Sequence, residues 1–449
     1  MVTDRHGQEM KGTGAVAVRH YERALEELLF FREEVVGEVG AVLEASPRSV
    51  MGHVFQAYLG LLGTEEKDAA EAAAAFGVFR RQVPVEGLTV RERMHVEAAS
   101  SWLGGDMHRA GRVLGELVVA YPRDALALAV GHQIDFFTGD AVLLRDRIGG
   151  ALAAWDRDDP HYGLLQGMYA FGLEEAGHYG LAEQVGLEAV ERNARDVWGI
   201  HAVVHAYEMQ GRHEDGIGYL DARRQAWSAG NYLNVHNWWH YALYLLETGR
   251  VDEVLAVYDA ALHHDGSAGA AMELLDAAAL LWRLYLAGAD TGGRWPVLAQ
   301  AWARRDDGPH YAFNDVHAVM AYVGAGRLGD AERLIGARQG WLRDAGAGLS
   351  NVAMTAEIGL PVCRALVAYG RRRYGEVVDL LLPVRRRLQE FGGSHAQRDA
   401  LQKTLVEAAL HAGRHDLGRT LLSERIHLRS RCPYNQQAWA RLMAKDSQG

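Results

Sequence analysis

The sequence of 449 residues contains only two cysteines, Cys363 and Cys432. Two thiols cannot form a disulfide framework or a zinc site built from thiolates. No stretch approaches 18 consecutive apolar residues, so we predict no membrane-spanning helix and no membrane partner. The polar N-terminus, MVTDRHGQEMKGTG, lacks the apolar stretch of a signal peptide. A cytoplasmic protein is the resulting expectation.

Lysine is also scarce, since only Lys11, Lys67, Lys403 and Lys445 contribute to the 47 basic residues. Acidic residues outnumber basic ones, and the net charge of -11 argues against nucleic acid as the main partner. The arginine runs 371–373 and 385–387 are expected to be solvated helix faces. A hydrophobic content of 49% is ample for the core of a globular protein.

Only nine prolines interrupt the chain, and alanine, leucine, glutamate and arginine are abundant, which predicts helices nearly throughout. A glycine between two amphipathic segments recurs every 34 to 44 residues, which suits a left-handed turn between antiparallel helices. These glycines are Gly105, Gly139, Gly177, Gly211, Gly249, Gly288, Gly326, Gly370 and Gly413. Five residues later most repeats carry a small or slim residue, which would let the paired helices approach closely: Ala110, Ala182, Gly216, Val254, Ala331, Gly375 and Gly418.

The period, the turn glycine and the small residue resemble tetratricopeptide repeats. We therefore predict an all-α fold, an α-α superhelix (a tetratricopeptide-like solenoid) of antiparallel helix pairs. The expected organisation is a mobile N-terminal tail (1–14), N-terminal helical repeats (15–160) and further repeats that enclose a pocket (161–440). The glycine-rich segment 343–351 interrupts the register and is expected to mark a subdomain boundary.

Two histidine pairs, His201/His205 and His236/His240, are the main candidate site. Residues four apart share one face of a helix, and Glu208 extends the first face by another turn. His95 and His201 lie ten residues before a turn glycine, whereas His240 and His317 lie nine before one. By resemblance to tetratricopeptide repeats, these positions line the concave inner wall. A single buried histidine such as His95 or His132 is more often a hydrogen-bonded core residue.

We expect catalytic roles for His201, His205, Glu208, His236, His240 and His317. Histidine can act as a general acid or base near neutral pH, and Glu208 or Asp315 could orient an imidazole. In the segment GGSHAQRD, Ser394 is expected to cap a helix whose first turn, with Arg398, suits an anionic group. The residues expected to bind substrate are Trp239, Asn237, Asp315, His395, Gln397, Arg398 and Asp399.

A metal site is a weaker interpretation of the same histidines. Neutral imidazoles and a carboxylate suit zinc or iron in principle. However, HAVVH (201–205) lacks the glutamate of the HExxH zinc-protease motif. We therefore predict no metal and no cofactor, and keep a histidine-ligated metalloenzyme as the second alternative.

Six strings of the sequence, in this order, resemble the tetratricopeptide repeat protein 38 family. The resemblance extends from about residue 160 to 425 and implies an all-helical repeat protein, often cytosolic, without implying an activity. The strings are GMYAFGLEEAGHYGLAEQ (167–184), HAVVHAYEMQGRHEDGI (201–217), HNWWHYALYLLETGR (236–250), LLWRLYLAG (280–288), FNDVHAVMA (313–321) and GGSHAQRD (392–399).

The leading hypothesis is a small organic, anionic ligand or substrate in a histidine-rich concave pocket, with acid–base catalysis that needs no cofactor. It requires the histidines from His201 to His395 to converge. The alternative is a scaffold that binds peptides or proteins, the usual role of helical-repeat arrays. A protein partner or a homo-oligomer is compatible with either hypothesis.

Overall fold

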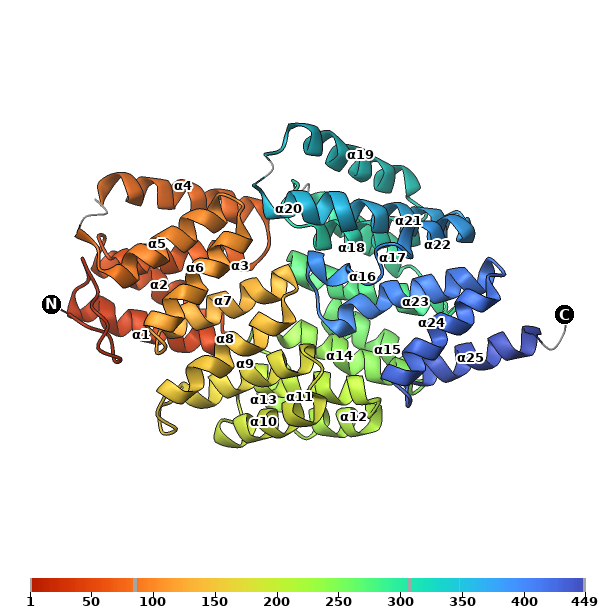
Figure 1. The fold of residues 1–449 in the computed structure, drawn as a ribbon, viewed down its shortest axis with the longest axis horizontal. Coiled ribbons are helices and arrows are strands. Elements are labelled where there is room, and N and C mark those ends of the chain that lie inside the picture. The colour runs from red at the N-terminus through yellow and green to blue at the C-terminus, as the bar shows by residue number, and fades with distance from the viewer. Residues whose placement is uncertain (1, 84–86, 306–307, 347, 447–449) are drawn as a thin grey trace. The chain divides into compact units, whose positions relative to one another are not determined.

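The computed structural model describes residues 2–83, 87–305, 308–346 and 348–446. Helices occupy most of these residues, and the one β pairing among them is an isolated bridge between Thr3 and Glu9. Consecutive helices pack against each other in antiparallel pairs (Figure 1). The predicted all-α, tetratricopeptide-like array of helix pairs is therefore confirmed.

The chain forms two compact units. The first comprises residues 1–203, 225–234 and 346–350, and the second comprises 204–224, 235–345 and 351–449. The division falls within one continuous helix, α11 (Val197–Gln210). The glycine-rich segment around 343–351 contributes residues to both units.

The first unit is built from the pairs α1/α2, α3/α4, α5/α6, α7/α8 and α9/α10. Asp106, Asp124 and Asp140 cap α6, α7 and α8, because each side chain accepts a hydrogen bond from the backbone N–H three residues later. The helices are α1 (Ala15–Leu29), α2 (Glu34–Ala45), α3 (Val50–Leu62), α4 (Glu66–Gln82), α5 (Val90–Leu103), α6 (Met107–Ala120), α7 (Ala125–Thr138), α8 (Ala141–Ala151), α9 (Tyr162–Glu175), α10 (Tyr179–Arg192) and the short α13 (Arg224–Trp227).

Residues 2–14, predicted to be a mobile tail, make specific contacts within the first unit. The Lys11 backbone N–H donates to Glu92 at 2.6 Å, and the Thr13 and Ser49 hydroxyls lie 2.8 Å apart. Both partners belong to the ends of helices α5 and α3. This segment therefore covers the N-terminal ends of two helices.

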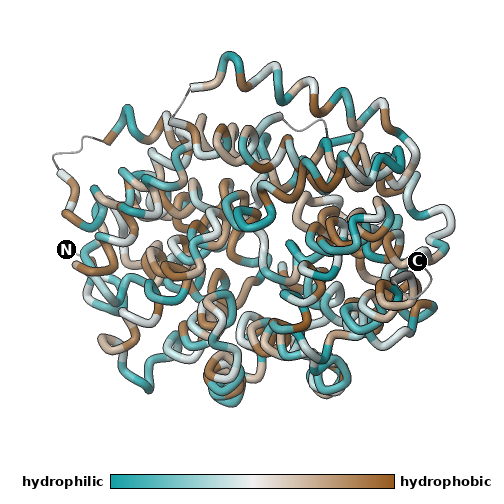
Figure 2. The backbone as a smooth tube through the Cα atoms, turned by 45° about the vertical axis from the view of Figure 1, so that its right-hand side comes forward, coloured by the Kyte–Doolittle hydropathy of each residue, from teal (hydrophilic) through white to brown (hydrophobic). Residues whose placement is uncertain are grey.

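The second unit places α16 against α18 and α23, while α18 also packs against α19 and α21. Apolar and polar residues alternate along the helices in the tube of Figure 2, as expected for helices with one buried face. The helices are α12 (His213–Asp221), α14 (Asn234–Glu247), α15 (Val251–Val257), α16 (Ala271–Leu286), α17 (Arg294–Arg305), α18 (Ala312–Gly324), α19 (Leu328–Asp344), α20 (Ser350–Ala353), α21 (Leu360–Gly370), α22 (Tyr374–Leu381), α23 (His395–His411), α24 (His415–Leu428) and α25 (Pro433–Asp446).

The turn glycines adopt the predicted left-handed conformation at every repeat except one. Gly370 is the exception, because Arg372 adopts the positive φ of that turn at 58°. Gly370 instead allows close packing: a Cβ atom there would lie 2.6 Å from Val323 on α18. Gly370 thus also lies at the turn of a helix pair, but the repeat has glycine here because the helices pack closely and not because the turn needs a positive φ.

The small residues that follow the turns also have the predicted role. Ala110, Ala182 and Ala331 are fully buried. At Gly216 a Cβ atom would lie 2.3 Å from the ring of Tyr244, so α12 and α14 could not pack as closely with any larger residue. Close packing is thus seen at these positions, at Gly216 between neighbouring helix pairs, whereas at Gly375 the nearest atom to an added Cβ would be 3.9 Å away.

One helical segment, Ser350–Gly370, is long and apolar enough to cross a membrane by length and composition. In the structure 67% of its most apolar window is buried by the rest of the protein. Core helices of water-soluble proteins have the same property.

Candidate histidine site

Three of the candidate histidines of the second unit, His205, His236 and His240, lie on the helices α11 and α14. His205 and His240 are fully buried, and Glu208 is 8% exposed. The side chain of His236 retains 16% exposure and is the member of this group that solvent reaches most. Because His236 and His240 are four residues apart on α14, one helix face presents both imidazoles.

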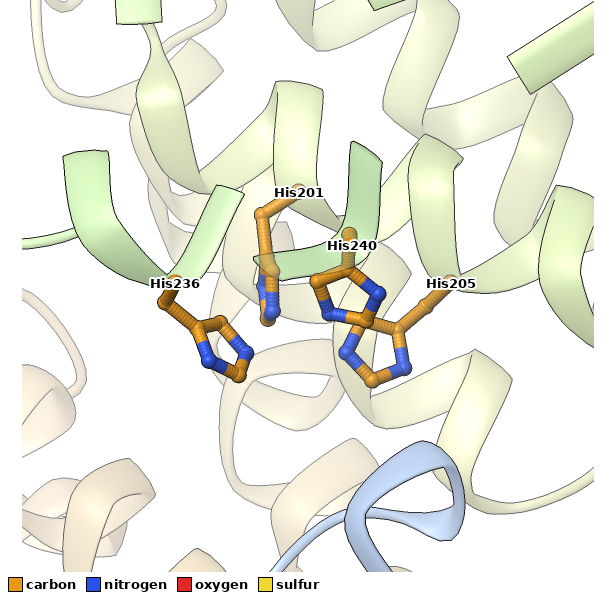
Figure 3. Close-up of side chains that lie close together, drawn as sticks. All are labelled: His201, His205, His236 and His240. Carbon is orange, nitrogen blue, oxygen red and sulfur yellow. The ribbon is translucent and has the colours of Figure 1, made fainter. Parts of the chain in front are cut away.

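We call His205, His236 and His240 the histidine cluster. The ring centroid of His240 lies 4.4 Å from that of His205 and 4.8 Å from that of His236, and the His205 and His236 centroids are 6.4 Å apart. Figure 3 shows these side chains gathered together. Two helices thus bring together four of the six residues expected to be catalytic, because Glu208 of α11 also lies 3.4 Å from His240.

Each histidine of α14 faces a carboxylate through Nδ1. His236 lies 2.8 Å from Asp276 on α16, and His240 lies 3.4 Å from Glu208 on α11. When the Nδ1–H of a histidine donates to a carboxylate, the proton stays on Nδ1, and Nε2 of the neutral ring keeps a lone pair that can act as a ligand or base. The predicted role of Glu208 as an orienting carboxylate matches this position.

His201 precedes His205 by one turn of α11 and belongs to the first unit. Its ring lies 4.9 Å from that of Trp198 and 5.1 Å from that of Phe171, so aromatic side chains of the first unit lie against it. The histidine cluster, by contrast, lies entirely in the second unit. One ring nitrogen from each of its three members lies within 4.8 Å of the others.

Trp239 and Asn237 of α14 are both fully buried. The Trp239 ring is stacked on His236 at 5.2 Å and lies 4.8 Å from His240. Its indole N–H has no hydrogen-bond partner within the described structure, and neither has the side-chain amide of Asn237. Buried polar groups in native proteins are nearly always hydrogen-bonded, so groups like these commonly mark a bound water, ion or ligand.

His317 and Asp315 share α18 but have different surroundings. His317 Nδ1 lies 2.8 Å from the carbonyl oxygen of Phe313, and burial lowers the pKa of His317 to about 4. Asp315 accepts two hydrogen bonds from Arg338 of α19, at 2.8 and 2.9 Å. Asp315 therefore holds two helices together, and the carboxylates that face imidazoles are Glu208 and Asp276.

The segment 392–399 begins α23 as predicted. Ser394 Oγ accepts from the Gln397 backbone N–H at 3.2 Å, and Gln397 Oε1 accepts from the Ser394 backbone N–H at 2.9 Å, which is a capping box. His395 opens the helix, and Arg398 donates to the Gly393 carbonyl oxygen. Gln397 also lies 3.5 Å from Asp276, which connects this helix start to the carboxylate of His236.

Asp399 belongs to a buried ion cluster. Its carboxylate lies 2.7 Å from Arg425, 3.5 Å from Lys403 and 3.6 Å from Arg429. Burial alone would raise the pKa of Asp399, but the three cations outweigh burial and hold it well below its usual value. These ion pairs join α23 to α24, which is a structural function for a residue expected to bind substrate.

Sequence reasoning did not single out Asp276 and Arg283 of α16. Both are buried, and they lie seven residues apart, which is two turns along one helix face. An aspartate and an arginine at that spacing within the apolar stretch MELLDAAALLWRLYL were the available signal. Their importance depends on which helix α16 packs against, and the sequence alone does not contain that information.

The arrangement suits a small, strongly coordinated ligand such as a metal ion. In a tetrahedral zinc site, Zn–N bonds of about 2.0–2.1 Å place the nitrogens roughly 3.4 Å apart. Nitrogens already within 4.8 Å of one another would need only small side-chain rotations to reach that spacing. The histidines can also transfer protons, since each of the α14 pair has a carboxylate partner.

No model of a known protein family matches the sequence. Among solved structures, the chain is similar to Cut9 in the APC/C Cut9–Hcn1 hetero-tetramer, with a TM-score of 0.43, 11% identity and coverage of 98% of this chain and 78% of that one. Human IFIT1, solved as a dimer with m7Gppp-AAAA, is similar with a TM-score of 0.42 and 12% identity, over 99% of this chain and 96% of that one. Yeast Tom70 is similar with a TM-score of 0.34 and 12% identity, over 96% of this chain and 89% of that one. All three are tetratricopeptide-like helical-repeat proteins.

Proposed function

We propose that this helical-repeat protein binds one transition metal ion through the histidine cluster, with Zn²⁺ as the ion that best fits its ligands. The supporting observation is the pairing of His236 with Asp276 and of His240 with Glu208. Metal-bound imidazoles usually donate their second ring N–H to a carboxylate, which orients the ring and strengthens the other nitrogen as a ligand. Imidazole suits zinc, copper, iron and nickel, whereas magnesium and calcium prefer oxygen ligands.

This proposal departs from the expectation that the site works without a metal. From the sequence alone, the metal interpretation is the weaker one because HAVVH lacks the glutamate of HExxH. In the structure the two carboxylates instead come from a later turn of α11 and from α16. Zinc bound by three protein nitrogens keeps a position for water and lowers the pKa of that water to about 7. Metal-assisted hydrolysis is the reaction class that this chemistry favours.

Metal analysis of the full-length chain, purified without chelator and after removal of any histidine tag, tests the proposal. We expect about one zinc per chain, and replacement by Co²⁺ should give the visible absorption of a tetrahedral site. His205→Ala, His236→Ala and His240→Ala should each lose the ion. His427→Ala is the matched control, because His427 is exposed on α24 of the same unit.

A wild-type chain that contains no stoichiometric ion and takes up neither Zn²⁺ nor Co²⁺ at micromolar concentration would overturn the metal proposal.

A metal-free acid–base site for an organic anion is the second candidate, favoured by the same two histidine–carboxylate pairs. It predicts a chain that lacks a metal but loses ligand binding in Asp276→Asn. The repeat architecture also supports a scaffold for other proteins. In that case substitutions of the histidine cluster would leave partner binding unchanged.

We also propose that the chain belongs with the tetratricopeptide repeat protein 38 family. The strings that carry the resemblance lie on α9 to α12, α14, α16, α18 and the start of α23, which include the helices of the site. If the metal proposal holds, relatives that share these strings should retain His205, His236, His240 and Asp276.

A further inference from the structure

Arg283 of α16 is a buried cation without an ion-pair partner among the described residues. It is 4% exposed, and its guanidinium donates only to backbone carbonyl oxygens: Ala279 at 2.9 Å, Ala396 at 2.5 Å and Gln397 at 3.5 Å. Burial lowers the pKa of Arg283, although Asp399, Glu208 and Glu247 act against this from beyond ion-pair distance. An isolated buried charge is costly, so its presence calls for a physical reason.

Four other buried arginines of this protein form ion pairs with a carboxylate. Arg91 pairs with Asp124, Arg147 with Asp135, Arg338 with Asp315 and Arg425 with Asp399, each with a closest distance between 2.5 and 2.8 Å. These pairs neutralise the guanidinium and connect helices. Arg283 differs from all four, because it donates only to backbone carbonyl oxygens and forms no direct ion pair among the described residues.

Arg283 also lies beside the histidine cluster. Its guanidinium carbon is 5.2 Å from the ring centroid of Trp239, the residue that is stacked on His236 and lies next to His240. Asp276, two turns earlier on the same helix face, pairs with His236. The charge of Arg283 therefore borders the site that we propose binds metal.

Two further buried groups near Arg283 lack a partner among the described residues. The Trp239 indole N–H is a pure donor, whereas His317 Nε2 is an acceptor, because His317 Nδ1–H donates to the Phe313 carbonyl oxygen. Of these two groups, only the indole N–H can donate to an anion. Arg283 and Asp276 both influence the pKa of His317, which places this ring in the same electrostatic environment. A buried guanidinium without an ion pair and an unsatisfied indole N–H together favour an acceptor that carries negative charge.

We propose that Arg283 binds an oxyanion, a carboxylate or phosphate group of the small molecule on which the histidine site acts. One N–H of Nη1 and the N–H of Nε are not used by the three hydrogen bonds to backbone carbonyl oxygens, and both can donate to such a group. This inference rests on the proposed function for its neighbouring ion, but the anion subsite is a separate property of Arg283. The ligand class is thus a small organic acid or phosphate ester.

Calorimetric titration of the full-length chain with inorganic phosphate and, separately, acetate tests the inference, with and without added Zn²⁺. We expect at least one of the two anions to bind wild type at one site. Arg283→Met should weaken that binding at least 10-fold, and Arg283→Lys should restore part of it. Preference for phosphate or acetate then identifies the oxyanion.

Arg338→Met is the matched control, because it also removes a buried arginine of the second unit. It leaves Asp315 uncompensated and should lower the melting temperature while the anion affinity stays unchanged. Arg283→Met should keep or raise the melting temperature without anion, because it removes an unpaired buried charge. Added phosphate or acetate should raise the melting temperature of wild type more than that of Arg283→Met.

The outcomes separate the two proposals. Anion binding that is equal in wild type and Arg283→Met, or absent from both, overturns the role of Arg283 even if the chain contains zinc. Anion binding that depends on Arg283 in a chain without metal supports the subsite and overturns the metal proposal. A lower melting temperature of Arg283→Met without anion would make Arg283 a structural residue and contradict the inference.

Discussion

In the first unit both ring nitrogens of His95 have hydrogen-bond partners, whereas the second unit gathers three imidazoles beside one another. His95 Nδ1 lies 3.2 Å from the Tyr58 hydroxyl, and its Nε2 lies 3.0 Å from Asp124, which Arg91 also contacts. In the second unit, the ring of His240 lies against those of both His205 and His236. Histidines at similar distances before a turn glycine therefore have different surroundings in the two units.

The difference lies in the neighbouring helices. The residue that caps α7, Asp124, is within reach of His95 on α5, so one carboxylate satisfies a histidine, an arginine and a helix start at once. For the histidine cluster, the neighbouring helix contributes another imidazole. A closed network stabilises the fold, while a group of imidazoles is suited to binding a ligand.

The largest expected effect concerns the network of the first unit. Asp124→Ala removes the close partner of Arg91 and His95 and the cap of α7, leaving the buried guanidinium with only Asp4, at 3.8 Å. We expect the free energy of unfolding of this unit to fall by about 3–5 kcal/mol. Urea unfolding followed by limited proteolysis of the first unit measures the change.

The same variant should leave zinc uptake by the second unit unchanged while the chain is folded. If Asp124→Ala loses less than about 1 kcal/mol, the network is not a major source of stability. If it loses zinc while still folded, the contrast between the two histidine environments fails.

The corresponding change in the second unit is Asp276→Asn. It keeps the size of the side chain but removes the charge that orients His236, so zinc affinity should fall by about 10- to 100-fold. Competition with a chromophoric chelator measures the affinity. Asp379→Asn, on the exposed surface of α22, is the matched control and should leave affinity unchanged. An unchanged affinity in Asp276→Asn would remove this carboxylate from the site.

Two buried aspartates extend the comparison to pH. Burial raises the pKa of Asp196, at the start of α11 in the first unit, to about 7, whereas the cations around Asp399 in the second unit outweigh burial and lower its pKa. Because the folded pKa of Asp196 is raised, its contribution to stability is present below the unfolded pKa of about 3.9 and is lost as pH rises through about 7. Asp399 has the opposite sign, and its contribution is lost as pH falls.

The free energy of unfolding of wild type should therefore fall by about 2 kcal/mol between pH 5 and 8 because of Asp196, and Asp196→Asn should not show this fall. Asparagine can still accept the Gly199 backbone N–H that Asp196 Oδ1 accepts at 2.9 Å. Chemical unfolding at both pH values measures the change. Asp399→Asn should instead lower the free energy of unfolding at pH 8. If Asp196→Asn were also less stable than wild type at pH 8, the predicted direction of the pH dependence of Asp196 would be wrong.

The smallest expected effect tests what the two units share, the helix-pair turn. Gly177 has a φ of 85°, and a Cβ atom added there would meet no atom within 4 Å. Gly177→Ala should therefore cost only the strain of a left-handed alanine, about 1 kcal/mol. Gly370→Ala in the second unit should act through a collision with Val323. Truncation by Val323→Ala should relieve Gly370→Ala, and thermal melts of the double variant check this.

Most of the fold and part of the site could be predicted from the sequence. Glycine spacing predicted the helix pairs because a left-handed turn is a local property of a few residues. The i, i+4 spacing placed His236 and His240 on one face for the same reason, and the residues next to Ser394 were enough to predict its cap. By contrast, Asp315 and Asp399 were expected in the site, but the structure shows them paired with Arg338 and with Arg425.

What the sequence determined by itself is what depends on residues close along the chain: helices, their turns, their caps and their faces. The tertiary structure decided which faces meet. It placed Asp276 beside His236 although 40 residues separate them, and left Arg283 without the carboxylate that its counterparts have. Such pairings depend on how α16 packs against α14 and α23, and burial then sets the electrostatic cost of every charge that lacks a partner.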